Sequence, residues 1–274
     1  MNSQKVLIKY GGNAMVNEEL KKQIAEKIAL LQASGYQVIL VHGGGPFINK
    51  ALDEAAIVST FFDGHRYTSP EALTCIEKTL KGEVNSSLVS LLNRAGLKAV
   101  GLSGKDGQFV TAEKRWHVQF DEKGKSQQVD LGQVGEVSHV DTTLVEILLR
   151  EGFTPVITCI AGDADGNEYN INGDVFAGKI ASALGVDAYI VLTDVDGLFL
   201  DFPDPKSIIP NLKLKDLKTY YGSVIQGGMI PKISSCEAAV VAGVKRAVIL
   251  NGTKPDQITD YLLENKLLGT TITA

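Results

Sequence analysis

Cysteine is scarce in this chain of 274 residues, which has three cysteines and one tryptophan. Cys75, Cys159 and Cys236 are odd in number, far apart in the sequence and without a Cys-x-x-Cys spacing. We therefore expect no disulfide framework and no cysteine zinc site, but reduced and mostly packed thiols, as in a cytoplasmic protein. The four histidines also lack metal-ligand spacing, so no metal ion held by protein side chains is expected.

An excess of positive charge is absent as well. The chain has 27 Lys and Arg residues against 32 Asp and Glu residues, which gives a net charge of −5. Nucleic-acid-binding proteins usually show a basic patch, and no Lys/Arg cluster stands out, so we expect no nucleic-acid partner. No apolar run approaches the roughly 20 residues that span a bilayer, and no signal-peptide pattern opens the sequence. A membrane partner is therefore not expected either.

Several common signatures of nucleotide-binding and hydrolytic enzymes are missing. No Gly-x-Gly-x-x-Gly follows the first apolar segment, and no Gly-x-x-x-x-Gly-Lys-Ser/Thr occurs anywhere. These absences argue against a Rossmann dehydrogenase and a P-loop NTPase. The absence of a Gly-x-Ser-x-Gly elbow argues against a serine hydrolase.

What is present is an alternation of apolar strands and amphipathic helices. Residues 5–10 and 38–41 read as buried strands that end in glycine turns, and a helix capped by Asn17 and Gly35 lies between them. This rhythm predicts an α/β protein with a parallel sheet. Further strands are expected at 98–102, 154–160, 188–192 and 247–250, and further helices at 69–94, 141–150, 173–184, 231–242 and 256–264.

Two segments depart from this alternation. Residues 108–130 alternate in short runs around a polar turn at 121–125, which predicts a β-hairpin excursion. Residues 270–273 are expected to form an edge strand. No linker divides the sequence, so we expect a single domain, 1–274, made of two lobes that meet near residue 165.

Glycine turns follow several of the predicted strands, at the place where open α/β sheets bind their ligands. Gly43, Gly44 and Gly45 lead into a helix that begins with Pro46, which leaves bare N–H groups at the positive end of a helix. This arrangement suits an anion. The alternative, for these glycines and for the Gly11–Gly12 pair, is a tight turn without a ligand.

Two lysines stand in unusual positions. Lys9 interrupts an apolar strand, and Lys232 opens a helix, where a cation opposes the helix dipole. A bound phosphate would stabilise both lysines, and Asp174 would supply a carboxylate to hold them in place for phosphoryl transfer. The alternatives are a solvated Lys9 at a sheet edge and simple helix capping by Asn172 and Asp174. Arg66 can grip a substrate carboxylate with two hydrogen bonds, or be a solvated loop residue.

Taken in order, these segments resemble the amino-acid kinase superfamily and, within it, the acetylglutamate kinases. The likeness extends over essentially the whole chain. The matching segments are Lys9-Tyr10-Gly11-Gly12-Asn13, His42-Gly43-Gly44-Gly45-Pro46, Asp63-Gly64-His65-Arg66, Gly101 to Gly107, Val134 to Val137, Tyr169 to Asp174, Leu192 to Val195, Gly227 to Lys232 and Gly269-Thr270.

The resemblance implies a three-layer αβα sandwich around a mainly parallel sheet. It assigns the N-terminal lobe, about 1–165, to the acylated amino acid and to dimerisation, and the C-terminal lobe, about 166–274, to ATP. The implied reaction moves the γ-phosphoryl of ATP to the side-chain carboxylate of N-acetyl-L-glutamate in arginine biosynthesis. Mg²⁺ would be held mainly by the nucleotide phosphates.

The resemblance also implies a role for each matching residue. Lys9 and Lys232 would stabilise the transition state, and Asp174 would organise them. Gly11 and Gly12 would bind the transferred phosphoryl group. The implied substrate-binding residues are Gly44, Gly45, Arg66 and Asn170, and the implied nucleotide-binding residues are Thr193 and Asp194.

Four residues depart from the pattern usual in this family: Tyr10, His65, Ser69 and Lys179. The first three are expected near the substrate, so a succinyl group is an alternative to acetyl, with His65 or Lys179 meeting its extra charge. Arginine-inhibited hexamers of the family carry a helix ahead of the first strand, which residues 1–4 do not provide. We therefore expect a homodimer that is insensitive to arginine.

Two other functions remain open. One is another kinase of the superfamily, acting on an aminoadipate derivative, aspartate, glutamate, carbamate or UMP. The other is a non-catalytic sensor of an amino-acid derivative or nucleotide. The joint presence of Lys9, Asp174 and Lys232 argues against the sensor, and the segments around Arg66 and Asn170 favour the acylglutamate substrate.

Overall fold

A computed structural model describes residues 3–62, 65–120 and 126–274. Asp63 and Gly64 of the segment that leads to Arg66, and the turn expected at 121–125, lie outside the described residues. The side chain of His65 lies outside them as well.

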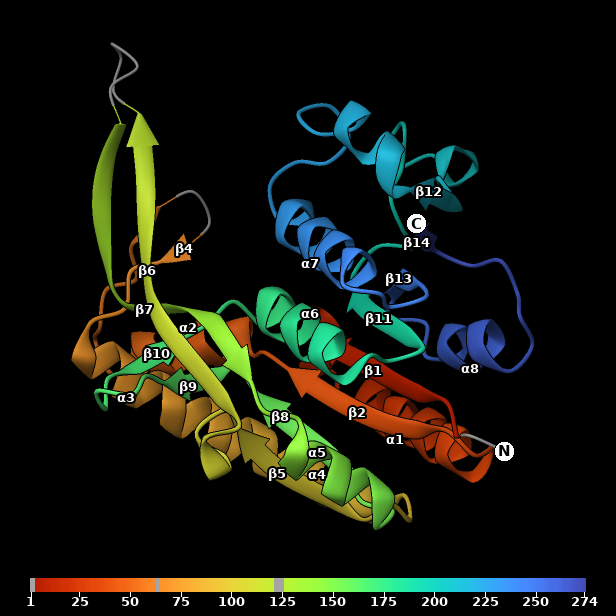
Figure 1. The fold of residues 1–274 in the computed structure, drawn as a ribbon, viewed down its shortest axis with the longest axis horizontal. Coiled ribbons are helices and arrows are strands. Elements are labelled where there is room, and N and C mark those ends of the chain that lie inside the picture. The colour runs from red at the N-terminus through yellow and green to blue at the C-terminus, as the bar shows by residue number, and fades with distance from the viewer. Residues whose placement is uncertain (1–2, 63–64, 121–125) are drawn as a thin grey trace.

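An eight-stranded sheet forms the centre of the molecule (Figure 1). Its strands lie in the order β12-β14-β13-β11-β1-β2-β8-β5, and every neighbouring pair is parallel except β13 and β14. The mainly parallel sheet is therefore confirmed. These strands are β1 (Lys5–Tyr10), β2 (Gln37–His42), β5 (Ala99–Ser103), β8 (Thr154–Thr158), β11 (Ala188–Thr193), β12 (Asn211–Lys213), β13 (Ala247–Asn251) and β14 (Thr270–Thr273).

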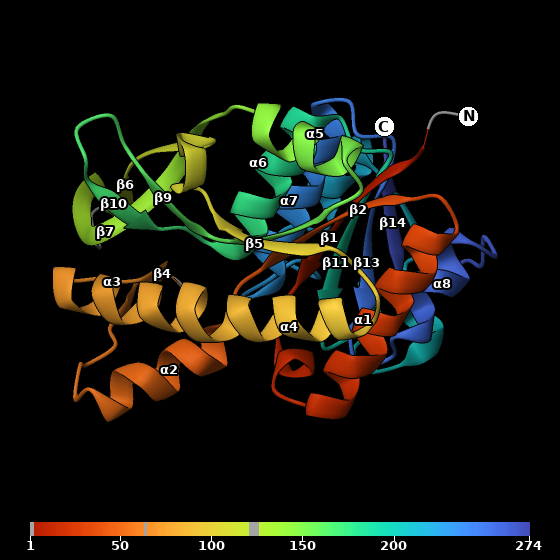
Figure 2. The same ribbon diagram turned by 90° about the horizontal axis from the view of Figure 1, so that it is seen from below.

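Helices cover both faces of this sheet, which confirms the αβα layering (Figure 2). The helices are α1 (Glu18–Ala33), α2 (Gly45–Glu54), α3 (Pro70–Glu77), α4 (Ser86–Arg94), α5 (Thr143–Arg150), α6 (Gly173–Leu184), α7 (Met229–Val241) and α8 (Asp256–Leu262). Alternation along β1 builds the two cores, because successive side chains of a strand point to opposite faces. Val6 and Ile8 pack with α1, α4 and α8, whereas Leu7 packs with α6 and α7.

The helix expected over residues 69–94 is continuous, but its middle is not α-helical. Between α3 and α4 lies a π-helical stretch, η2 (Lys78–Asn85), and the two α-helices run in line on either side of it (Figure 2). π-Helical turns are rare and are found mostly at functional sites. Hydrophobic periodicity cannot reveal such a turn, because the apolar stripe continues through it.

A small second sheet carries the hairpin excursion. Strands β6 (Val110–Phe120) and β7 (Ser126–Val140) pair antiparallel and project beyond the body of the molecule (Figure 1). The excursion is confirmed, but its second strand continues past the expected end at residue 130. It continues because the base of β7 is buried and pairs with β10 (Glu168–Asn170), which in turn pairs with β9 (Ile160–Gly162).

The expectation of an edge strand at residues 270–273 is wrong. Strand β14 lies between β13, to which it is antiparallel, and β12, to which it is parallel. β12 has three residues, Asn-Leu-Lys, which is too short for an alternating pattern to predict it. The remaining short elements are β3 (Phe61–Phe62), β4 (His65–Arg66), η1 (Asn13–Met15), η3 (Asp106–Gln108), η4 (Pro205–Ser207) and η5 (Leu214–Thr219).

None of the helices in the described part of the chain is both long enough and apolar enough to cross a bilayer.

Candidate active site

A cleft of about 240 Å³ opens at the carboxyl ends of β1 and β2. The loops there meet because the two strands are parallel neighbours, so both glycine turns fall at the same edge of the sheet. Eight of the eleven residues expected to form the site line this cleft. They are Lys9, Gly11, Gly12, Gly44, Gly45, Arg66, Asn170 and Asp174.

Asp174 joins the two lysines at the floor of the cleft. Lys9 Nζ lies 2.9 Å from Oδ1 of Asp174, and Lys232 Nζ donates a hydrogen bond of 3.0 Å to Oδ2. Lys9 is 6% exposed, so the alternative of a solvated lysine at a sheet edge is wrong. The three charges come from three elements, β1, α6 and α7, which are far apart in the sequence.

The carboxyl group of Asp174 stays ionised although it is buried. Burial by itself raises the pKa of Asp174, but Lys9 and Lys232 outweigh this effect, and the pKa lies below its ordinary value. Oδ1 of Asp174 is buried, and Lys9 Nζ lies 2.9 Å from it. An ammonium group has three donor protons, so the others are available to a second acceptor in the cleft.

Two residues at the start of α6 have different tasks: Asn172 caps the helix, and Asp174 supplies the charge. Asn172 is the N-cap, and its side chain accepts hydrogen bonds from the backbone N–H groups of Asp174 and Val175. The alternative of simple helix capping by Asn172 and Asp174 therefore holds for Asn172 but not for the side chain of Asp174, which pairs with the lysines. The side chain of Asp174 is consequently free to point at the lysines rather than back at the helix end.

Glycine is required at three positions of the cleft, Gly11, Gly12 and Gly44. A Cβ at Gly11 would lie 2.5 Å from Lys9 Nζ, and one at Gly44 would lie 2.6 Å from a methyl group of Leu80. Gly12 has a φ of +77°, which favours glycine. A side chain at Gly11 would displace Lys9, and one at Gly44 would displace Leu80, so the backbone itself forms this wall of the cleft.

Arg66 lies at the other side of the cleft and is held on two sides. Its guanidinium donates hydrogen bonds to Ser59 Oγ and Asn49 Oδ1, and it stacks 4.5 Å from the ring centre of Phe61. Burial lowers the pKa of Arg66, and nearby Asp53 opposes this effect. A guanidinium has five donors, so Arg66 can still bind a carboxylate of a ligand.

The remaining predicted residues lie next to the cleft rather than in its lining. Lys232 reaches it through its bond to Asp174. Thr193 is buried at the end of β11, and Asp194 follows it. The carboxylate of Asp194 approaches the Gly11–Gly12 turn, since a Cβ on Gly12 would lie 2.7 Å from its Oδ1.

Three of the unusual positions do not lie where the substrate was expected. Tyr10 is fully buried in the core on the α1 side, and its hydroxyl donates to Ala14 O at 2.8 Å. Ser69 caps α3 through a bond from Ala72 N–H. Lys179 is exposed on α6 and does not line the cleft. These three side chains do not line the cleft.

Sequence reasoning assigned no role to several residues of the site. Cys159 and Phe61 line the cleft, and His42 is fully buried behind the Gly43–Gly45 loop. Burial raises the pKa of the Cys159 thiol to about 11, which makes it a packing group rather than a nucleophile. Of these three residues, only His42 could have been noticed in the sequence, because it is a polar residue at the end of an apolar strand.

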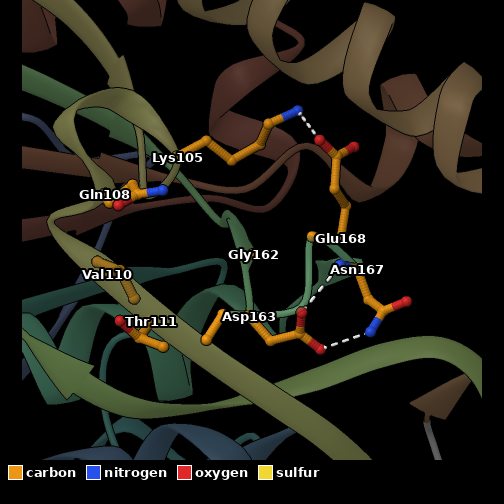
Figure 3. Close-up of a pocket in the computed structure, with 10 residues that line it drawn as sticks. Lys105, Gln108, Val110, Thr111, Gly162, Asp163, Asn167 and Glu168 are labelled. Atoms are coloured by element: carbon orange, nitrogen blue, oxygen red, sulfur yellow. Dashed lines mark hydrogen bonds and ion pairs between the residues drawn. The ribbon is translucent and has the colours of Figure 1, made fainter.

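A second cavity, of about 330 Å³, lies beside the base of the hairpin (Figure 3). The charged side chains that line it already have partners within the protein. Lys105 pairs with Glu168 and Glu77, and Asp163 accepts hydrogen bonds from Asn167. A charged ligand would have to break these pairs, whereas the cleft at β1 and β2 offers backbone N–H groups and a lysine to an anion.

The cleft therefore combines a glycine-walled anion site, two lysines held by one carboxylate and an arginine that can bind a second anion. The part of the chain that the structure describes holds no group of three His, Cys, Asp or Glu side chains arranged for a metal ion. Such a site can stabilise charge that develops on a transferred phosphoryl group.

A model of the amino acid kinase family matches residues 4–251, so the chain belongs to the amino acid kinase family. Its relatives include the acetylglutamate kinase of Leptospira biflexa, 43% identical over 97% of this chain and 90% of that protein. Another is the acetylglutamate kinase of Methanococcus maripaludis strain C7, 42% identical over 99% of this chain and 92% of that protein. Within the family, the chain therefore groups with the acetylglutamate kinases.

Solved structures show the same fold. The smu.665 protein of Streptococcus mutans is 28% identical with a TM-score of 0.75, and 98% of each chain is covered. An N-acetylglutamate synthase from Neisseria gonorrhoeae has a TM-score of 0.82 at 21% identity, covering 99% of this chain and 59% of that chain.

Proposed function

We propose that this kinase transfers the γ-phosphoryl group of MgATP to the side-chain carboxylate of N-acetyl-L-glutamate, giving an acyl phosphate and ADP in arginine biosynthesis. The observation that carries the proposal is the ion-paired set of Lys9, Asp174 and Lys232 beside the glycine-walled cleft. The acetylglutamate kinases that match nearly the full chain support the same substrate.

The two lysines act on the charge of the transferred group. Phosphoryl transfer spreads negative charge over the equatorial oxygens of the phosphoryl, and preorganised cations stabilise that charge without reorganising. Asp174 keeps the two ammonium groups at a fixed separation. The nucleophile is an ionised carboxylate, so the reaction needs no general base. Gly11 and Gly12 offer backbone N–H groups to the phosphoryl.

The acylated amino acid occupies the side of the cleft formed by Gly44, Gly45, Arg66 and Asn170. Arg66 binds its α-carboxylate, because the guanidinium lines the cleft and is already oriented by Ser59 and Asn49. Lys9 and Arg66 are the cationic side chains among the described lining residues, and Asp174 already engages Lys9. This distribution favours the acetyl group over succinyl, which would bring a further carboxylate.

ATP lies on the other side, near Thr193 and Asp194 at the end of β11. Mg²⁺ enters with the nucleotide and is held mainly by its phosphates. In this arrangement residues 1–165 form the lobe for the acylamino acid and for dimerisation, and residues 166–274 form the lobe for ATP. We propose that the enzyme works in the cytoplasm as a homodimer.

Trapping the acyl phosphate with hydroxylamine tests the proposed reaction. ATP consumption and hydroxamate formation are compared for N-acetyl-L-glutamate, N-succinyl-L-glutamate, free glutamate and aspartate at equal concentration. We expect turnover with the acetyl compound. Preference for the succinyl compound would overturn the acetyl assignment, and no hydroxamate from any of the four would direct attention to the other kinases of the family.

A further inference from the structure

The ring of His42 lies behind the glycine loop that forms one wall of the cleft. His42 ends β2, is fully buried and directly precedes Gly43. One ring nitrogen, Nδ1, is 2.8 Å from the carbonyl oxygen of Gly43, and the other, Nε2, is 2.9 Å from Nδ2 of Asn85. Both nitrogens of this buried ring are thus partnered, one of them with the loop itself.

The partners of Asn85 determine which nitrogen of the ring carries the proton. Nδ2 of Asn85 also donates to the carbonyl oxygen of Val156 at 2.9 Å, so this atom is the amide nitrogen. An amide nitrogen only donates, and Nε2 of His42 must therefore accept. The proton of the neutral ring lies on Nδ1, which consequently donates to the carbonyl of Gly43.

Asn85 is built into this place by two further features. It is the last residue of the π-helical stretch η2, and its side chain reaches β2 and β8. On β5 it meets Gly101, where a Cβ would collide with Oδ1 of Asn85. A π-helical turn and a glycine thus both accommodate one buried amide, which donates to β8 and to His42.

We propose that His42, held by Asn85, is a positioning residue that aims the Gly44 N–H into the cleft. The Gly43–Gly44 peptide is planar and trans, so its C=O and N–H point in opposite directions. When the His42 ring fixes the Gly43 carbonyl on the core side, the Gly44 N–H must face the cleft that Gly44 lines. The inference rests on the proposed function in one respect, which is that the Gly44 N–H donates a hydrogen bond to the acylamino acid or to its phosphoryl group.

The surroundings of His42 keep the ring neutral. Burial lowers its pKa to about 4, the bond to Gly43 O opposes this, and the charges of Lys81 and Lys9 lower it further. Lys81 is itself held by Asp106 and by the Gly101 carbonyl. The Nδ1–H form and its bond to Gly43 therefore persist throughout the neutral range.

Nuclear magnetic resonance tests the positioning without any substrate. In full-length protein with ¹⁵N-labelled histidine and glycine, we expect the His42 ring to be neutral at pH 7 with its proton on Nδ1. We expect the Gly44 amide signal to move in His42→Leu and to stay near its wild-type place in His42→Asn, whose amide nitrogen can still donate to Gly43 O. A proton on Nε2, or equal Gly44 shifts in both variants, would overturn the proposal.

Kinetics of the same variants test the consequence for catalysis. A misaimed backbone donor is expected to lower kcat/KM for N-acetyl-L-glutamate by roughly 10- to 100-fold in His42→Leu, with the KM for ATP changed little. His42→Asn should recover most of the loss. Asn85→Leu, which leaves Nε2 without its donor, should lower kcat/KM in the same way. A folded His42→Leu with wild-type kcat/KM for N-acetyl-L-glutamate would contradict the proposal, as would a loss confined to the KM for ATP.

The two measurements separate the possible failures. If wild-type protein does not phosphorylate N-acetyl-L-glutamate, the proposed substrate is wrong, while the tautomer and the Gly44 shifts still decide the role of His42. If His42→Leu does not fold, as its thermal melting curve would show, the wild-type tautomer and the comparison of His42→Asn with Asn85→Leu decide it.

Discussion

Lys9 and Lys232 approach the carboxylate of Asp174 from opposite ends of the sequence, and their charges can be removed one at a time. Lys9→Met and Lys232→Met keep most of the side-chain volume but remove the charge. Each is expected to lower kcat by about 100- to 1,000-fold, because a preorganised charge is lost from the transition state. Nucleotide and N-acetyl-L-glutamate should still bind, as measured by calorimetry.

Lys179→Met is the matched control for this pair, since Lys179 is exposed on the same helix as Asp174. It is expected to keep wild-type turnover. Unchanged kcat in Lys9→Met and Lys232→Met would remove both lysines from the mechanism.

Asp174 links the site to stability. Its pKa is lowered in the folded state, so its contribution is fully present above the ordinary carboxyl pKa of 3.8 and is lost as pH falls through the folded value. Asp174→Asn leaves two lysines without their shared counter-charge and should cost about 3 kcal/mol of unfolding free energy near neutral pH. Urea unfolding from about pH 3 to 7 measures the free energy of unfolding of both proteins. The difference between Asp174→Asn and wild type should become smaller at the acid end of this range.

Asp165→Asn, which removes an exposed carboxylate from a turn, serves as the control. It should unfold like wild type over the same range. A gap for Asp174→Asn that is constant with pH, or that grows toward acid, would contradict the ionised state assigned to this residue.

At the scale of elements, the contact between α6 and α7 sets the distance from Asp174 to Lys232. Gly178 of α6 faces α7 so closely that a Cβ there would lie 2.9 Å from the carbonyl oxygen of Ser235. Gly178→Ala is therefore expected to separate the helices, costing about 1 to 3 kcal/mol of stability and lowering kcat. Thermal melting and steady-state kinetics measure the two effects.

Gly82→Ala is the matched control for Gly178→Ala, because Gly82 is exposed, lies in a helical segment and has open space where a Cβ would stand. It should keep both stability and turnover. If Gly178→Ala were as stable and as active as this control, the helix contact would not set the geometry of the site.

Sequence patterns predicted the long elements well and the short or irregular ones poorly. The strands around Lys9 and His42 have strong apolar runs, and these runs made the parallel sheet and its glycine turns predictable. β12 is too short for a pattern, so the position of β14 between two strands was missed. The joining of Lys9, Asp174 and Lys232 was predicted from chemistry, but the Asn85 contact depends on a π-helical turn, for which composition gives no signal.

At the scale of the whole molecule, ligands that bind both sides of the cleft should stabilise the fold. At 100 times Kd, a ligand that binds only the folded state adds about 2.7 kcal/mol to the free energy of unfolding. We expect N-acetyl-L-glutamate and a non-hydrolysable ATP analogue each to raise Tm. Gel filtration should show a dimer. A hexamer, or a Tm that neither ligand changes, would overturn these expectations.

The central place of β1 has a consequence for how the chain folds during synthesis. β2, its neighbour on one side, follows soon after it, but β11, its neighbour on the other, comes only after the whole first half of the protein. Until β11 emerges from the ribosome, an apolar strand keeps one side unpaired, and such edges recruit other chains. The unpaired side of β1 is therefore the feature that exposes the nascent first half to aggregation.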